Sequence, residues 1–209
     1  MDIVSHAGWG YAALRWRGRR TAWWGALAGA APDLLAFVPP MVVRVSEHGW
    51  EGLPGRGPRG PGMWRVGGPP LPQEWADIYN HYYVYTHSLV ILGMVAGLLY
   101  LTGKRGWLWL AIPYALHILM DIPTHERFQT PFLYPFSSWT FQGIRWSHPL
   151  IFWPNWAALI GVHVYLTLRY RRKEGEGAQG MADGSWGAGN GDRRLPRAHL
   201  PAAVGGVRV

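Results

Sequence analysis

The chain contains no cysteine, and this absence narrows both its covalent chemistry and its metal chemistry. Without thiols there is no disulfide framework and no zinc–thiolate site, so a bound metal would have to be held by imidazole and carboxylate groups. Acidic residues are also few, 12 against 20 Lys and Arg, which gives a formal net charge of +8. The basic residues lie mostly beside apolar runs rather than in a stripe of their own. We therefore expect no nucleic-acid partner, and membrane lipid with anionic headgroups as the counter-charge.

Several common catalytic and structural patterns are missing as well. The 209 residues hold no P-loop and no Ser-His-Asp pattern, and the Gly-rich stretch does not follow a strand as a dinucleotide-binding fold requires. We find no internal repeat and no coiled-coil heptads. Asp2 stands where a secretory signal has basic residues, so we expect the first helix to remain in the mature protein.

Long apolar runs are what the sequence does have. A bilayer's hydrocarbon core needs about 20 apolar residues of helix. Residues 149–168 meet this need without Asp, Glu, Lys or Arg, and residues 87–103 and 107–122 come close to it. Residues 3–16 and 21–43 indicate a helical hairpin. The predicted fold is therefore all-α, a polytopic membrane bundle made of this hairpin and about three further spans.

The hairpin carries small residues at four-residue spacing, namely Gly25 with Gly29 and Ala26 with Ala30. Small side chains let the backbone of a neighbouring helix approach closely within lipid. We therefore expect tight packing of the second helix of the hairpin against another helix.

Composition divides the chain into a membrane-embedded domain over residues 1–173 and a tail over residues 174–209. Within the domain, residues 43–85 are expected to form a Gly/Pro-rich loop, because 13 of the 22 residues from 51 to 72 are Gly or Pro. The tail is rich in Gly and polar residues without helical or strand period, so we expect it to be disordered.

Basic residues set the expected orientation in the membrane. They cluster beside short connections at residues 15–20, 104–105 and 169–173, and such positions favour the cytoplasmic side. The sequence thus predicts a multi-pass protein of the cell (inner) membrane.

This topology brings six ligand-type residues to the opposite, non-cytoplasmic end of the bundle. They come from the start and end of the hairpin, from the start of the next span and from the end of the span after it: His6, Asp33, His87, His117, Asp121 and His125. His117 and Asp121 are four residues apart, so they share one helix face and can bind one metal. His125 follows Pro123, which ends or kinks the helix, and lies just beyond that turn.

Imidazole and carboxylate ligands suit zinc, with manganese as the alternative, and a mixed His/Asp set is typical of hydrolytic metal sites. A metal-activated water would attack a phosphorus or carbonyl centre, and a second ion would stabilise the leaving oxygen. Asp121 is the expected bridging and catalytic carboxylate, and Asp33 the expected proton acceptor.

Four segments resemble the YdjM-type family of membrane-bound metal-dependent hydrolases, which is similar in ligand order to zinc-dependent phospholipase C and P1 nuclease. They are SHAGWGYAALR at 5–15, GALAGAAPDLLAF at 25–37, THSL at 86–89, and LHILMDIPTH with PFLYPFS within 116–137. The resemblance implies a helical metal-hydrolase core in which the six residues above bind metal and His148 adds a further ligand. It fixes no substrate, and a phosphodiester of a lipid is the substrate that we expect. Four residues after His148, where the soluble enzymes have an acid, this chain has Phe152.

Three alternatives stay open at the level of sequence. His117 and Asp121 can form an ordinary helix-face hydrogen bond. His87 and His117 can ligate the iron of a b-type haem. The polar residues can also hold the helices of a non-catalytic membrane scaffold together. His163, alone in an apolar run, is expected to be a hydrogen-bonded packing residue.

Overall fold

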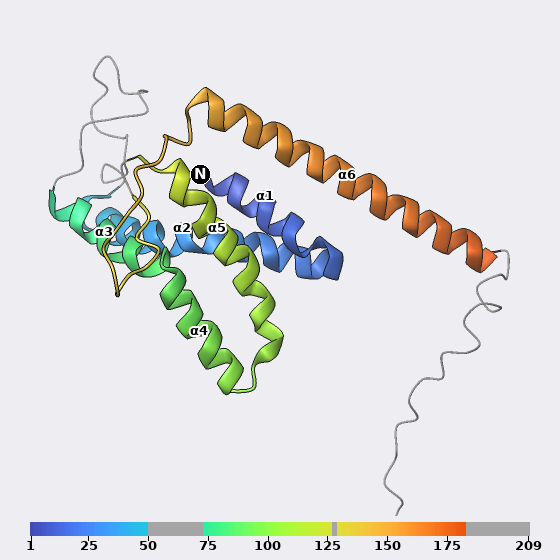
Figure 1. Cartoon of the computed structure of the whole chain (residues 1–209), viewed down its shortest axis with the longest axis horizontal. Coiled ribbons are helices and arrows are strands. Elements are labelled where there is room, and N and C mark those ends of the chain that lie inside the picture. Colours follow the sequence, from blue (N-terminus) through green and yellow to red (C-terminus); the bar gives the residue numbers. More distant parts are fainter. Residues whose placement is uncertain (50–72, 127–128, 183–209) are drawn as a thin grey trace, which may run out of the picture. The chain divides into compact units, whose positions relative to one another are not determined.

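The computed structural model describes residues 1–49, 73–126 and 129–182, and this part of the chain is helical with no strand (Figure 1). The all-α prediction is therefore confirmed. The helices follow one another as α1 (Ile3–Leu14), η1 (Arg15–Arg17), α2 (Arg19–His48), α3 (Gln73–Thr86), α4 (Leu89–Leu101), η3 (Arg105–Leu110), α5 (Ala111–Thr124) and α6 (Pro149–Ala182). Of the loop expected over residues 43–85, residues 50–72 lie outside the described residues.

α1 and α2 form the expected hairpin and pack closely. The Asp2 side chain caps α1 by accepting a hydrogen bond from the Ser5 backbone at 2.9 Å. The chain turns at Gly18, whose φ of 112° favours glycine. A Cβ on Gly10 would collide with the Gly25 carbonyl, and one on Gly29 would lie 2.5 Å from the His6 carbonyl. The close approach expected from the small residues of α2 is thus confirmed.

α3 lies in a segment that the sequence analysis assigned to a loop. Its Trp75, Tyr79 and Tyr83 are buried and recur every four residues, which places them on one helix face. Phe37 of α2 contacts the rings of Tyr79 and Tyr83, with centroids 5.9 and 6.2 Å apart. The helix forms because this aromatic stripe covers α2.

α4 and α5 form a second hairpin, with η3 at its turn. Ser88 caps α4 by accepting from the Ile91 backbone at 3.2 Å, and the chain bends by 49° between α3 and α4. α5 packs against α1 and α2 through buried residues that include Ile118. His87 therefore sits at a break between helices, directly opposite the buried face of α5.

The first part of α6 packs on α1. Asn155 accepts a hydrogen bond from the Trp9 indole at 2.8 Å and donates one to Ser5 Oγ at 2.9 Å. His163 donates to the Gly8 carbonyl at 3.0 Å, so it is a hydrogen-bonded packing residue as expected. Leu166 is the last residue of one compact unit, and Thr167 is the first residue of another. α6 continues to Ala182, nine residues past the expected end of the domain at Lys173, and Arg172 pairs with Glu176 one turn later.

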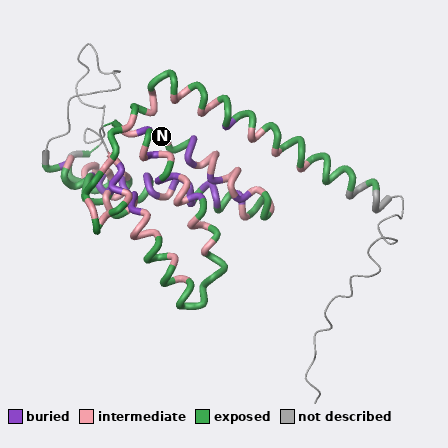
Figure 2. The backbone as a smooth tube through the Cα atoms, viewed as in Figure 1, coloured by how far each residue is buried: buried purple, intermediate pink, exposed green. Residues whose placement is uncertain are grey.

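Within the described ranges, two helices are long and apolar enough to cross a membrane: residues 19–47 of α2 and residues 149–176 of α6. A third span results if the bent pair of α3 and α4 is counted as one. α4 and α5 have 13 and 14 residues and are about 20 Å long, shorter than the bilayer core of about 30 Å. Exposed residues run along α4 and α6 (Figure 2), and they include large apolar side chains such as Leu98, Leu101 and Leu150.

Candidate metal centre

Four of the expected ligands converge in the core of the helical hairpins. Asp33 comes from α2, His87 from the break before α4, and His117 and Asp121 from one face of α5. One donor atom from each residue lies within 4.8 Å of the donor atoms of the other three. Asp33 keeps 11% of its side chain exposed, whereas the other three side chains are fully covered. This buried group can hold a metal ion, with Asp33 at its accessible side.

The distances between donor atoms match the edges of a small coordination polyhedron. His87 Nε2 lies 3.1 Å from His117 Nε2 and 3.5 Å from both Asp33 Oδ1 and Asp121 Oδ2. His117 Nε2 lies 3.7 Å from Asp33 Oδ1 and 3.1 Å from Asp121 Oδ2. Four ligands around zinc at its usual bond lengths would be separated by about 3.4 Å in a tetrahedron. The observed separations bracket this value.

The tautomer of His117 follows from its other ring nitrogen. Nδ1 lies 2.6 Å from the Gly29 carbonyl, which only accepts hydrogen bonds, so Nδ1 carries the proton. In the neutral ring, Nε2 is then a lone pair directed at the other ligands. A histidine held in this way by a backbone carbonyl is typical of metal ligands.

The outer ring nitrogen of His87 faces a hydroxyl group, and the other contacts of that hydroxyl favour the same tautomer. Thr86 Oγ1 donates to the carbonyl of Tyr82 at 3.1 Å, or to that of Tyr83 at 3.3 Å, so it accepts from His87 Nδ1 at 3.0 Å. The ring of Tyr83 stacks on His87 with centroids 3.8 Å apart. His87 Nε2 is therefore a second lone pair at the centre.

These two tautomers leave four acceptors facing one another: two imidazole nitrogens and two carboxylate oxygens. Asp121 Oδ2 is buried without a hydrogen-bond partner in the described part of the chain. Buried polar atoms are rarely left in this state without a functional reason. A proton on one imidazole would satisfy one acceptor pair, whereas a divalent cation would satisfy all four atoms.

The other oxygen of Asp121 faces a second set of nitrogens. Asp121 Oδ1 lies 2.9 Å from His6 Nε2 and 3.3 Å from His125 Nδ1, and the Met1 amino group also contacts it. The approach of His6 lacks hydrogen-bond geometry, so both of its ring nitrogens are without such a bond within the described ranges. Burial lowers the pKa of His6 to about 4, which keeps the ring neutral and able to bind metal at pH 7. α1, which carries His6, is itself too short to span a membrane.

His148 lies apart from this group. It is exposed at the start of α6, where its Nδ1 accepts from the Leu150 backbone at 3.3 Å. It lines a polar cavity of about 530 Å³ together with Glu126 and Arg145, which pair at 3.2 Å. This cavity borders the metal centre through the backbone, since the Gly143 amide donates to the His125 carbonyl at 3.0 Å.

The chain matches no family model, no curated protein and no solved structure. The resemblance to membrane-bound hydrolases therefore stays a prediction, and the site has to be interpreted from its own chemistry.

The residues that orient the ligands were not predicted from the sequence. Thr86 holds His87, while Ser88 caps α4. Tyr83 had no predicted role, because α3 was not expected. The spacing of Tyr79, Tyr83 and His87 at four residues was a usable signal. No sequence signal marks the carbonyl of Gly29, because every residue has one.

Proposed function

We propose that the chain is a membrane-bound, metal-dependent hydrolase that acts on a phosphoester, with a lipid phosphoester as the favoured substrate. The observation that carries this proposal is the buried group of four donor atoms from Asp33, His87, His117 and Asp121, in which the Gly29 carbonyl and the Thr86 hydroxyl hold the outer nitrogens of the two imidazoles. Among the described residues the Met1 ammonium contacts the other oxygen of Asp121, and a divalent cation would satisfy the four donor atoms that face one another. Zinc is the expected ion and manganese the alternative.

The protein's own groups have distinct roles in this proposal. His87, His117, Asp33 and Asp121 would hold the first ion, and His6, His125 and the second oxygen of Asp121 offer ligands for another. Asp121 is thus the bridging carboxylate. A bound ion would supply a water of lowered pKa as the nucleophile. Asp33, as the accessible carboxylate, is placed to accept the proton that such a water releases.

The haem alternative fits this geometry poorly. His87 and His117 have their Nε2 atoms 3.1 Å apart and their ring planes inclined at 62°, with two carboxylates beside them. A porphyrin between these nitrogens has no room, and a haem pocket needs neither acid. The scaffold alternative predicts a protein without bound metal, so metal analysis separates it from the hydrolase.

The deciding experiment is elemental analysis of the protein purified in detergent, together with hydrolysis of a soluble phosphodiester. We expect near-stoichiometric zinc or manganese, and we expect His117→Ala to remove most of the metal and the activity. His163→Ala is the matched control, because this histidine also bonds a helix carbonyl but lies on α6. A metal-free preparation that keeps full activity would overturn the proposal, as would equal metal content in the two variants.

A further inference from the structure

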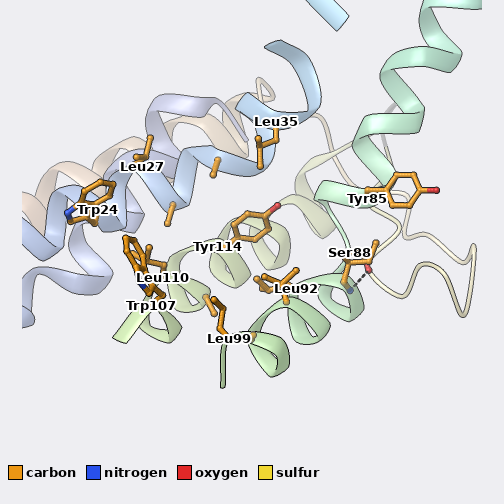
Figure 3. A pocket seen from close by; sticks show the side chains of 16 residues that line it. Trp24, Leu27, Leu35, Tyr85, Ser88, Leu92, Leu99, Trp107, Leu110 and Tyr114 are labelled. Carbon is orange, nitrogen blue, oxygen red and sulfur yellow. Dashed lines mark hydrogen bonds between the residues drawn. The ribbon is translucent and has the colours of Figure 1, made fainter. Parts of the chain in front are cut away.

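An apolar groove lies between α2 and the hairpin of α4, η3 and α5, with a volume of about 490 Å³ (Figure 3). Trp24, Leu27 and Leu35 line it from α2, and Leu92 and Leu99 line it from α4. Its volume falls in the usual range for ligand pockets, about 300–1,000 Å³. Almost all of its wall is hydrocarbon, so its occupant must be apolar along most of its length.

The polar groups of the groove gather toward one end, beside the metal centre. Figure 3 shows Tyr85 and Ser88 at the end away from Trp24 and Trp107, with Tyr114 between them. Ser88 directly follows the ligand His87. The Tyr114 hydroxyl donates to the Thr86 carbonyl at 2.9 Å, and Thr86 in turn holds His87. The groove and the metal centre therefore share a wall.

The length of the groove corresponds to one leaflet of a bilayer. On α2 it runs from Trp24 to Leu35, a rise of about 16 Å at roughly 1.5 Å per residue. This is about half of the hydrocarbon core of roughly 30 Å. The polar end of the groove lies near Leu35, close to Asp33 at the middle of α2, and its other end lies at Trp24 near the start of that helix.

The described residues of the protein do not fill this groove. α6, the remaining long helix, uses Asn155 and His163 to bond to α1 instead. The occupant must therefore come from outside the described part of the chain.

We propose that this groove holds one acyl chain of the lipid substrate and so places its phosphoester at the metal centre; this rests on the proposed function. Because lipid tails are as apolar as the groove wall, entry from the bilayer brings little hydrophobic gain. The contribution of the groove is positional, since it holds the polar end of the lipid next to the ligands. The protein would then prefer long-chain lipid esters over soluble ones.

The test uses Ala96→Trp, which places an indole in the groove, and Ala158→Trp on the exposed face of α6 as its matched control. Both proteins and the parent are reconstituted in phosphatidylcholine vesicles with a phospholipid that carries a photoreactive diazirine on its acyl chain. Labelled residues are mapped by mass spectrometry. Turnover is measured on a long-chain phospholipid and on bis(p-nitrophenyl) phosphate.

We expect labelling of the parent to concentrate on the groove. In Ala96→Trp we expect this labelling and the long-chain turnover to fall by about tenfold, because the ester is no longer positioned. Soluble-diester turnover and metal content should stay unchanged, which also shows that the variant folds. Equal loss on both substrates, or labelling spread evenly over α4 and α6, would overturn the inference. Cross-linking of the groove to a second copy of the chain would overturn it too.

The two proposals fail in different ways. If no ester is hydrolysed by the metal-loaded parent, the hydrolase assignment fails, while the labelling still decides whether the groove takes an acyl chain. If the soluble diester is hydrolysed and the groove is not labelled, only the acyl-chain proposal fails.

Discussion

Two atoms outside the ligand set, the Thr86 hydroxyl oxygen and the Gly29 carbonyl oxygen, orient the imidazole rings of the candidate centre. His87 and His117 carry their protons on the outer nitrogens because Thr86 and Gly29 offer acceptors there. Both acceptors are uncharged, so they orient the rings without adding charge to the centre. Metal affinity should therefore depend on residues that never touch the ion.

Removal of the Thr86 hydroxyl tests this dependence. Thr86→Val keeps the shape of the side chain but leaves His87 Nδ1 without its acceptor, so zinc affinity should fall by about 10–100-fold. Competition with a chelator measures the change, and Thr86→Ser should restore most of the affinity. Thr102→Val is the control, because Thr102 makes the same bond to a carbonyl one turn back at 2.8 Å without a histidine beside it. Unchanged affinity in Thr86→Val would contradict the forced tautomer.

Part of the centre could be predicted from sequence because helix geometry alone places His117 over Asp121. Asp33 and His87 required the topology as well, and the expected hairpins supplied it. Two features could not be predicted. The first is that one oxygen of Asp121 faces His6 while the other faces His117, which depends on the side-chain rotamer. The second is the bond of His117 to the Gly29 carbonyl, because every residue type has a backbone carbonyl.

At the scale of helices, the contact of α1 with α2 is set by backbone rather than by side chains. Gly10 and Gly25 lie so close that neither has room for a Cβ. This contact brings His6 of α1 against the ring of His117, with centroids 3.6 Å apart. The packing of one helix pair thereby completes the site on α5.

Gly10→Ala should loosen this contact. The added methyl would meet the Gly25 carbonyl, and overpacking of this kind costs about 1–3 kcal/mol. We expect a lower Tm in a detergent-based thermal unfolding assay. Gly97→Ala, in α4 with open space around it, is the control and should leave the Tm unchanged or slightly higher. If both variants melt at the same temperature, the glycine contact does not stabilise the hairpin.

The sequence predicted the apolar helices α2 and α6 but not the aromatic helix α3. Apolar runs indicated α2 and α6 because hydrophobicity alone signals a helix buried in lipid. α3 was not predicted, because its buried face consists of Trp and Tyr side chains separated in sequence by polar residues. The segment before it is rich in Gly and Pro, which favoured a loop. The bend at His87 also divides a run that looks continuous in sequence.

At the scale of the whole molecule, the described part of the chain contains two helices with the length and hydropathy that a span requires, and a third span results if α3 and α4 act together. The expected hairpin and three further spans included α4 and α5 as separate crossings, which their lengths do not support. The positive charges at residues 104–105 nevertheless predict that the turn between α4 and α5 faces the cytoplasm. The open end of this hairpin, where the metal centre lies, is then expected to face the opposite side.

The absence of cysteine makes this orientation directly measurable. Lys104→Cys labels the turn of the hairpin, and Gln142→Cys labels the polar segment beside the metal centre. In oriented membrane vesicles, a membrane-impermeant maleimide should reach Lys104→Cys from the cytoplasmic side and Gln142→Cys from the opposite side. The unmodified chain has no thiol and gives no background. Labelling of both positions from one side would reject the proposed orientation.

Gly29 links the assembly of the helices to the filling of the site. Its carbonyl accepts the hydrogen bond of His117 Nδ1, and its Cα packs against the backbone of α1 at His6 and Gly10. A shift of α1 against α2 would therefore also displace the acceptor that orients His117. Under the proposed function, an ion bound at this centre would stabilise the packing of α1 on α2, since a ligand that binds only the folded state stabilises that state. Loss of the ion would then make the protein easier to unfold and more exposed to proteolysis.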